Sequence, residues 1–480
     1  MINIQHTIKK FSLELQTQNV ELSYALHKRC SKLVKEDLVV KLDKILSAQF
    51  SNNEIVRVNK IEIDLGNINN NDLEKEFIEK CISGFTEKIK SINASRKIDA
   101  SSPEIEKISK EDSSIEHFFY FLLTGKMPWA LQGINFANWQ AELCIVIKSN
   151  QRYFIKKLTE TAAFQPAALE RLIIQFDDFF ILAVVPNNMP LVKADFENLF
   201  LAVKKIIPFS QMVVVRKKIL QALLPVLLNF PHTIEENKIQ QLIENLSKDY
   251  PGTEEKLIIS LQEKIIEIIK KVNENFLPGE LNYTTAEKKI NALLKEPTKN
   301  ENTEEKINNI IEEKSVFIEN AGLIILHPFL HNLFKATGLM EEDSFENDFC
   351  KQKAVHLLQY LVNGEHQMPE FLMPLNKILC GLTNQEHIDR FIQLPDAAII
   401  EAGKLLDAVI THWSVLKNTS AASLQQTFLQ RKGKLSFNEP DGYWKLQVER
   451  NAVDILLDKV PWGFAYIKLP WMLFPLAVEW

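Results

Sequence analysis

Glycine is scarce in this chain, with only 14 among 480 residues, whereas leucine, isoleucine, lysine, glutamate and asparagine are abundant. Turn-dense β-sandwiches and the phosphate-binding loops of nucleotide-binding α/β folds depend on glycine, because it adopts backbone angles that other residues avoid. Leucine, lysine and glutamate are good helix formers. The composition therefore predicts a mainly α-helical protein, and a length of 480 residues predicts more than one domain.

Prolines interrupt the middle of the chain and limit the length of its helices. Proline ends or kinks a helix, so the stretch from Ile115 to about Lys295 is predicted to form successive short helices. One of them is expected between Pro166 and Pro186. No long uninterrupted heptad pattern occurs, so the sequence predicts compact helical bundles rather than a continuous rod. The expected helix between the two prolines presents one apolar face, formed by Leu169, Ile173, Phe176, Phe180 and Val184.

The first 92 residues predict a small α+β domain in the order β-α-β-α. Apolar residues alternate with polar ones over 11–16 and again over 61–65, which is the two-residue period of a half-buried strand. The apolar residues of 61–65 are odd-numbered, whereas Val56 and Val58 are even-numbered and would face the other side of one continuous strand. A bulge or break is therefore expected near Asn59. The helix between the two strands carries an apolar stripe at three- or four-residue spacing, formed by Leu26, Cys30, Val34, Leu38, Leu42 and Ile45.

Two polar stretches divide the rest of the chain. Residues 93–114 have linker composition, and residues 297–314 are polar with mixed charge. We therefore predict a helical domain over 115–296 and a C-terminal helical domain over 315–480. The latter has a tryptophan-rich, β-containing end, where residues 435–448 alternate like strands. Two helices in these domains end alike, with YFLLTG before Pro128 and YLVNG before Pro369.

Charge and cysteine content narrow the range of partners. A net charge of −6 gives no general attraction to nucleic acid or to an anionic membrane. No signal sequence is evident at the start, and the apolar stretches are too short to insert into a membrane. The five cysteines are scattered and lie in apolar helical patterns, which predicts buried, reduced thiols and a reducing compartment. We expect the protein to be made in the cytoplasm.

A search for chemistry finds few candidates. The common motifs of nucleotide enzymes, serine hydrolases and zinc proteases are absent, so we expect neither an enzyme nor a cofactor. His327 and His331 are four residues apart and are weak candidates for a metal site. Because His327 precedes Pro328, however, it is expected to lie just outside the helix. Asp177 and Asp178 are interpreted as charges on a solvated face or at a helix end, and the basic cluster 216–218 as a solvated helix face.

Tryptophans that follow proline or end the chain are candidate anchors. Proline fixes the backbone and thus the direction of the large side chain after it. Such residues anchor either the protein core or a docking surface, and the sequence leaves both readings open. The candidates are Trp129, Trp462, Trp471 and Trp480.

These segments together resemble the contractile injection system tape measure family of phage-tail-like particles. The N-terminal match is VNKIEIDLG at 58–66, and the middle contributes FFYFLLTGKMPWAL. The C-terminal match is more specific. It comprises NAGLIILHPFLHNLF at 320–334, KAVHLLQYLVNG at 353–364, LNKILCGL at 375–382, THW at 411–413, FLQRKGKL at 428–435 and VPWGFAYIKLPWMLFPLAVEW at 460–480.

The resemblance implies a structural protein that helps set the length of the inner tube during assembly. Its implied partners are inner-tube, baseplate or spike proteins, with several copies in each particle. The implied location is the bacterial cytoplasm during assembly and then the interior of the particle. Release of the protein together with the particle is also compatible with this resemblance. Two alternatives remain: an assembly scaffold or adaptor of the same machine, and an enzyme or toxin cargo.

Overall fold

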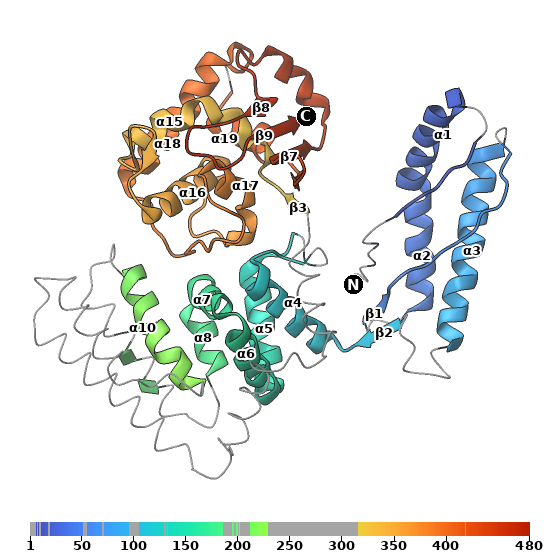
Figure 1. Ribbon diagram of the computed structural model, residues 1–480, viewed down its shortest axis with the longest axis horizontal. Helices are drawn as coiled ribbons and strands as arrows, with labels where there is room; N and C mark the ends of the chain where they lie inside the picture. The colour runs from blue at the N-terminus through green and yellow to red at the C-terminus, as the bar shows by residue number, and fades with distance from the viewer. Residues whose placement is uncertain are drawn as a thin grey trace, which may run out of the picture. The chain divides into compact units, whose positions relative to one another are not determined.

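The protein is described here by a computed structural model. It describes His6, Ile8, 11–17, 20–50, 55–69, 72–95, 105–128, Leu131, 133–185, 194–195, 198–199, Leu201, 212–228, 315–417 and 419–480. The chain divides into two compact units, Met1–Glu116 and His117–Trp480. The structure is mainly helical with a few short strands, so the predicted fold class is confirmed (Figure 1). The helices within these ranges lack the combined length and apolar character needed to cross a bilayer.

Two long helical stretches and two short strands form the first unit. Its elements are α1 (Val20–Leu33), a π-helical turn (Val34–Leu38), α2 (Val39–Gln49), β1 (Ile55–Val58), α3 (Leu73–Ser95) and β2 (Ile105–Ile108). Strands β1 and β2 pair antiparallel. The predicted stripe on the first helix is confirmed, because Cys30, Leu38 and Leu42 are buried. Leu38 and Leu42 pack with Phe77 and Ile89 of α3 in the core of this unit.

The strands of the first unit lie at other positions than predicted. Residues 11–17 and 61–69 carry no regular secondary structure, and the strand is Ile55–Val58. The expected break near Asn59 coincides with the end of that strand. Ile61, Ile63 and Leu65 nevertheless pack against the helical core. Alternation of apolar and polar residues indicates an extended segment with one buried side. In this unit the helices bury that side, and the segment does not pair with a strand among the described residues.

The middle of the chain forms a set of short helices, which we call the middle helices. They are α4 (Lys110–Thr124), α5 (Phe136–Ser149), α6 (Gln151–Phe164), α7 (Pro166–Gln175), α8 (Asp178–Val184) and α10 (Met212–Leu227). The prediction of a single helix between Pro166 and Pro186 is wrong, because two helices, α7 and α8, lie there. The expected helix breaks at Phe176 because the Asp177 side chain accepts a hydrogen bond from the Phe180 N–H, 2.9 Å away, and caps a new helix. Of the two interpretations of Asp177, the charge at a helix end is therefore the one that is confirmed.

Phenylalanine rings fill the centre of the middle helices. Phe118 contacts the rings of Phe119, Phe154, Phe176 and Phe180 at centroid distances of 5.1–5.6 Å. Phe176 stacks on Phe180 at 4.3 Å. Because Phe176 and Phe180 lie on either side of the break, the ring cluster holds α7 and α8 together across it.

The C-terminal part, residues 315–480, combines short helices with a sheet. Its helical elements are η5 (Ala321–Leu326), α15 (His327–Ala336), α16 (Asp348–Asn363), η6 (Glu370–Leu372), α17 (Pro374–Leu379), α18 (Asp396–His412), η7 (Ser414–Leu416), α19 (Ala421–Leu424), η8 (Gln425–Leu429) and η9 (Ala452–Lys459). Its strands are β3 (Ser315–Ile318), β4 (Met340–Glu341), β5 (Ser344–Phe345), β6 (Gly433–Asn438), β7 (Tyr443–Val448), β8 (Tyr466–Ile467) and β9 (Leu476–Glu479).

Five of these strands form one sheet in the order β3-β6-β7-β9-β8. The pairs are antiparallel except for β7 with β9. The alternation predicted over 435–448 is confirmed as the β6–β7 hairpin, in which Leu435 faces Leu446 and Phe437 faces Trp444. Leu435, Leu446 and Leu476 bury one side of the sheet in the same core as the helices.

The cysteine prediction is confirmed in its structural part. Cys30, Cys81, Cys144, Cys350 and Cys380 are all free and buried. Burial raises the pKa of Cys81 and Cys144 to about 11, so these thiols stay protonated near neutral pH.

Candidate functional site

Three buried amide side chains join motifs that lie far apart in the sequence. Asn320 opens the motif at 320–334, Gln359 lies in 353–364, and Asn376 lies in 375–382. The Asn320 Nδ2 donates to Asn376 Oδ1 at 2.7 Å and to Gln359 Oε1 at 3.1 Å. The Asn376 Nδ2 donates to the Val355 carbonyl at 3.1 Å. Because buried amides require such partners, this cluster fixes the relative positions of η5, α16 and α17.

A glycine allows the motif at 320–334 to touch the motif at 428–435. A side chain at Gly322 would overlap the backbone of Phe428 and Leu429. Beside it, the Ala321 N–H donates to the Arg431 carbonyl at 2.9 Å. The approach of η5 to the end of η8 therefore requires glycine at this position.

Two of the predicted tryptophan anchors hold the C-terminal tail on the helices. The Trp462 Nε1 donates to the Ile325 carbonyl at 2.9 Å, and the Trp471 Nε1 donates to the Leu379 carbonyl at 2.8 Å. Both rings are half-buried against the C-terminal core. These contacts favour the core-anchor reading of the two residues.

The last tryptophan closes a polar cluster at the end of the chain. Asp454 receives hydrogen bonds from Arg431 at 2.6 and 3.0 Å and from the Trp480 Nε1 at 3.0 Å. The Arg431 guanidinium also lies 5.2 Å from the centre of the Trp480 ring. Trp480 thus ties β9 to the capped start of η9. The fourth candidate, Trp129, lies outside the described residues.

The two candidate metal ligands bond to backbone carbonyls instead. The His327 Nδ1 lies 2.9 Å from the Ile324 oxygen, and the His331 Nε2 lies 2.9 Å from the Glu342 oxygen. His331 also contacts Asp343 at 3.0 Å. Within the described ranges, groups of three or more potential metal ligands are not found.

The expectation that His327 lies outside the helix is wrong. His327 has helical backbone angles and is the first residue of α15, although proline follows it. The preceding η5 helix runs directly into α15, so the chain is already helical at this point. This continuity overcomes the preference of a residue before proline for extended angles.

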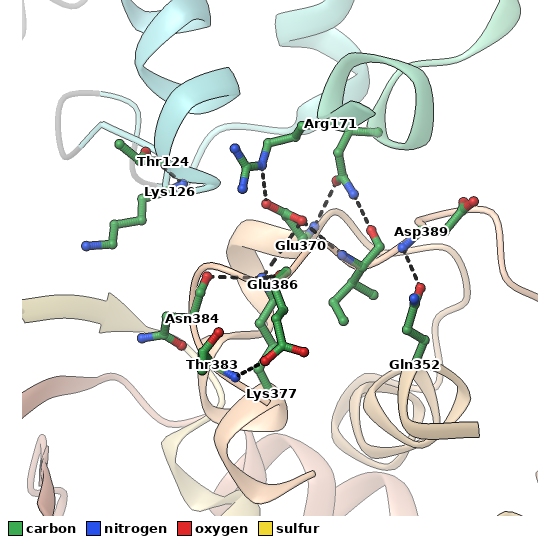
Figure 2. Close-up of polar contacts among 12 residues, drawn as sticks. Thr124, Lys126, Arg171, Gln352, Glu370, Lys377, Thr383, Asn384, Glu386 and Asp389 are labelled. Carbon is green, nitrogen blue, oxygen red and sulfur yellow. Dashed lines mark hydrogen bonds and ion pairs between the residues drawn. The ribbon is translucent and has the colours of Figure 1, made fainter. Parts of the chain in front are cut away.

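A buried charge cluster joins the middle helices to the C-terminal part (Figure 2). Arg171 of α7 points at Glu370 of η6, with 2.6 Å between Nε and Oε1, and neither residue is more than 2% exposed. Glu370 also accepts from the Ile388 N–H at 3.1 Å and lies 3.8 Å from Lys377 Nζ. Lys377 donates to the Glu386 carbonyl at 2.7 Å. Arg171 further donates to the Leu122 carbonyl of α4.

The charges in this cluster shift one another's ionisation. Burial, the largest influence, opposes the charge of Glu370, but Lys377, Arg171, His387 and the Ile388 N–H together hold the pKa of Glu370 below its ordinary value. Burial lowers the pKa of Lys377, although Glu370 opposes that effect. Burial and the Arg171 charge lower the pKa of His387 to about 4, so its imidazole is neutral at pH 7. The site therefore holds two cations around one carboxylate.

The first of the two similar helix ends forms one wall of this cluster. Gly125 and Gly364 both have left-handed backbone angles, and each N–H bonds back to the helix, at the Phe121 and Tyr360 carbonyls. The two ends differ in their surroundings. A side chain at Gly125 would overlap the Glu370 carboxylate, whereas Gly364 faces open space. Only the end of α4 therefore lies against the buried ion pair.

Further contacts flank the charge cluster. Gln175 of α7 accepts from the Glu370 N–H at 3.0 Å and donates to the Ile388 carbonyl at 2.5 Å. The Arg390 N–H donates to the Ile174 carbonyl at 3.1 Å, and its guanidinium lies 4.7 Å from the Phe136 ring. The Phe371 ring contacts the rings of Phe121 and Phe136, each at 6.0 Å. The junction is thus polar at its centre and aromatic beside it.

The reading of the basic cluster 216–218 as a solvated face is wrong for Arg216. This residue is 8% exposed, pairs with Asp178 at 2.7 Å, and donates to the Ile173 and Phe176 carbonyls. Its guanidinium also lies 4.4 Å from the Phe391 ring. The free carbonyls at the end of α7 need donors, and Arg216 supplies them.

The sequence reasoning missed Arg171, Gln175 and Glu370, although one signal was present. In α7, Ala168, Leu172 and Gln175 are buried, and Arg171 shares this face at helical spacing. A charged residue at a core position of an amphipathic helix indicates a buried partner. The position of that partner, Glu370, could not be read from its own neighbourhood in the sequence.

A cavity of about 300 Å³ lies where α15, α16 and α18 meet, lined in part by Glu346, Cys350 and Lys353. Burial raises the pKa of the Cys350 thiol, and the Glu346 charge adds to this effect. An activated nucleophile needs a lowered thiol pKa. The Cys350 thiol therefore lacks this form of activation.

Comparison with known proteins gives one match. A sequence model of the family described as "Contractile injection system tape measure protein" matches residues 5–480. No curated protein matches the chain. No solved structure matches it either.

Proposed function

The chain belongs to the contractile injection system tape measure protein family, and from this premise we propose that it helps set the length of the inner tube as a structural component of the particle. The family match over 5–480 carries this proposal, because it includes both ends of the chain and everything between them. The buried, hydrogen-bonded motifs of the C-terminal part support a structural role.

We propose that the two ends of the chain dock and that the residues between them set the spacing. Residues 1–95 and 315–480 each contain a hydrophobic core of their own. Docking partners would be inner-tube, baseplate or spike proteins, with assembly in the cytoplasm before the chain enters the particle. The predicted division into domains at 93–114 and 297–314 is part of this proposal, and the second linker lies outside the described residues.

The described helices are short compared with the distance that a ruler of 480 residues could span. The longest helical run, 20–49, spans about 45 Å at about 1.5 Å per residue. A fully helical chain of this length would reach about 720 Å. The described parts form compact units instead. The proposed ruler must therefore extend during assembly.

A deletion series within residues 229–314 tests the ruler. Such deletions leave the described helices and strands intact. Removing 40 residues should shorten the tube by roughly 60 Å if the segment is helical and by roughly 130 Å if it is extended. Inserting 40 residues at the same place should lengthen the tube by the same amount. Tube lengths are measured by electron microscopy of purified particles.

Unchanged tube length in intact particles from both variants would refute the ruler. The scaffold alternative makes a separate prediction, because a scaffold leaves the particle when assembly ends. Quantitative mass spectrometry of finished particles distinguishes the two, since a ruler remains inside the tube at constant copy number.

A further inference from the structure

The described contacts between the middle helices and the C-terminal part converge on one short segment. On the C-terminal side they involve Glu370, Phe371, Ile388, Arg390 and Phe391. We call residues 370–391 the latch segment. On the other side, the polar contacts come from the end of α7, at Arg171, Ile174 and Gln175. The two parts therefore meet through a localised junction.

The main hydrophobic core of the C-terminal part is formed by residues of that part. Its buried members run from Ile318 to Leu476 and include none of the described residues of the middle helices. Phe371 and Phe391 contact the middle helices from outside that core. Junctions of this kind within a chain, more polar than a core, permit relative motion of the joined parts.

The charges of the junction are balanced on the C-terminal side alone. Glu370 and Lys377 form a neutral pair within that part, and Glu370 also keeps the Ile388 N–H as a donor. Arg171 is the additional cation that the middle helices contribute. When Arg171 withdraws, Glu370 retains both partners and the guanidinium becomes hydrated, so separation leaves no buried charge without a counterion.

We propose that the Arg171–Glu370 contact is a latch that holds the middle helices on the C-terminal part in the free chain and opens when the chain extends into the tube. The proposal rests on the proposed ruler function, which requires the compact chain to lengthen. The polar centre of the junction suits this step, because the Arg171 guanidinium becomes hydrated when the two parts separate.

The latch is first tested by hydrogen exchange on the purified full-length chain. In Arg171→Met, exchange at the Glu370 and Arg390 amides should accelerate about tenfold or more, because their acceptors lie across the junction. Amides of α16 and α18 should keep their protection. The matched control is Lys156→Met, which breaks an exposed pair with Glu160 inside α6 and should leave the two reporter amides unchanged. Unchanged reporter amides in Arg171→Met, or equal acceleration throughout α16 and α18, would overturn the latch.

A reversible covalent lock tests whether opening is needed for assembly. The bond from the Arg390 N–H to the Ile174 carbonyl brings the two backbones together, so Ile174→Cys with Arg390→Cys is the pair chosen to join the two parts, with formation of the disulfide checked by mass spectrometry. The oxidised full-length chain should support few full-length tubes, and reduction of the same chain should restore them. Normal tubes from the oxidised chain would overturn the latch.

The outcomes separate the latch from the ruler. If tube length follows the deletion series while the locked chain assembles normally, the ruler stands and the latch falls. If the locked chain blocks assembly while tube length ignores the deletions, the ruler falls, and with it the latch as a device for extension, although opening of the junction is needed for assembly.

Discussion

At the scale of single residues, buried polar groups connect separate motifs of the C-terminal part. The Nδ2 atoms of Asn320 and Asn376 both donate to Gln359, and Glu370 has three donors or cations around it. When one partner is removed, the other stays buried without a hydrogen bond. The resulting loss of stability is typically larger than the net contribution of the bond itself. Asp389 is different, because the effect of burial on its pKa exceeds that of its hydrogen bond and the nearby cations.

Asp389 gives a pH-dependent prediction. Burial raises its pKa to about 6, while the Phe391 N–H and the charges of Arg216 and Lys217 oppose the shift. The folded-state pKa exceeds the unfolded-state pKa of about 3.9. The protonated Asp389 carboxyl therefore makes its full contribution to stability below about pH 3.9, and this contribution is lost as the pH rises through about 6. Asp389→Asn, which keeps an acceptor for Phe391, should stabilise the protein at pH 7.5 by on the order of 2 kcal/mol and have little effect at pH 4.

The measurement for Asp389→Asn is thermal unfolding of the full-length chain at both pH values, with the wild type run in parallel. An equal change in melting temperature at pH 4 and pH 7.5 would show that the ionised carboxylate is not the cause.

At the scale of elements, the C-terminal part depends on close contacts between helices that belong to separate motifs. The contact between η5 and η8 is the tightest, because the backbone of Phe428 occupies the position of a side chain at Gly322. The hydrogen bond from Ala321 to Arg431 holds the same two segments. A small outward shift of either helix would break this bond.

Gly322→Ala should therefore destabilise the C-terminal part by about 3 kcal/mol, because the obstacle is backbone and cannot rotate away. The matched control is Gly403→Ala in α18, where the new methyl group meets open space. That change should stabilise the protein by roughly 0.5–1 kcal/mol, since alanine is the better helix former. Denaturant unfolding of both variants measures the difference, and similar stabilities would contradict the close contact.

At the scale of the whole molecule, the chain consists of two units with different hydrophobic cores. Phe77 lies in the core of the first, at 1% exposure, and Leu446 is fully buried in the second. Separate cores imply that the units unfold separately. The proposed ruler requires these compact units to rearrange when the chain assembles.

Calorimetry of the full-length chain should show at least two unfolding transitions. Phe77→Ala should reduce the free energy of unfolding of the first unit by about 3–5 kcal/mol, which lowers the temperature of its transition and leaves the other transition in place. Leu446→Ala should destabilise the second unit by about 2–5 kcal/mol and lower the temperature of the other transition. If both variants displaced one common transition, the two cores would be a single cooperative system.

Much of the fold could be predicted because it depends on local pattern. Low glycine content predicts the helical class, helical spacing predicts the stripe on α1 and α2, and alternation predicts the β6–β7 hairpin. Alternation over 61–65 predicted a strand and was wrong, since the same pattern arises when an extended chain packs on helices. Pro186 alone did not predict the end of α7, because Asp177 begins a new helix nine residues earlier.

The sequence by itself determined the class of the fold and, through its C-terminal motifs, the family. Both are properties of residues that are close together in the chain. Only the tertiary structure decided that Arg171 meets Glu370, that Arg216 is buried, and that His327 and His331 bond to carbonyls. Each of these contacts joins separate segments or depends on the backbone path between them, and residue spacing in the sequence carries no information about either.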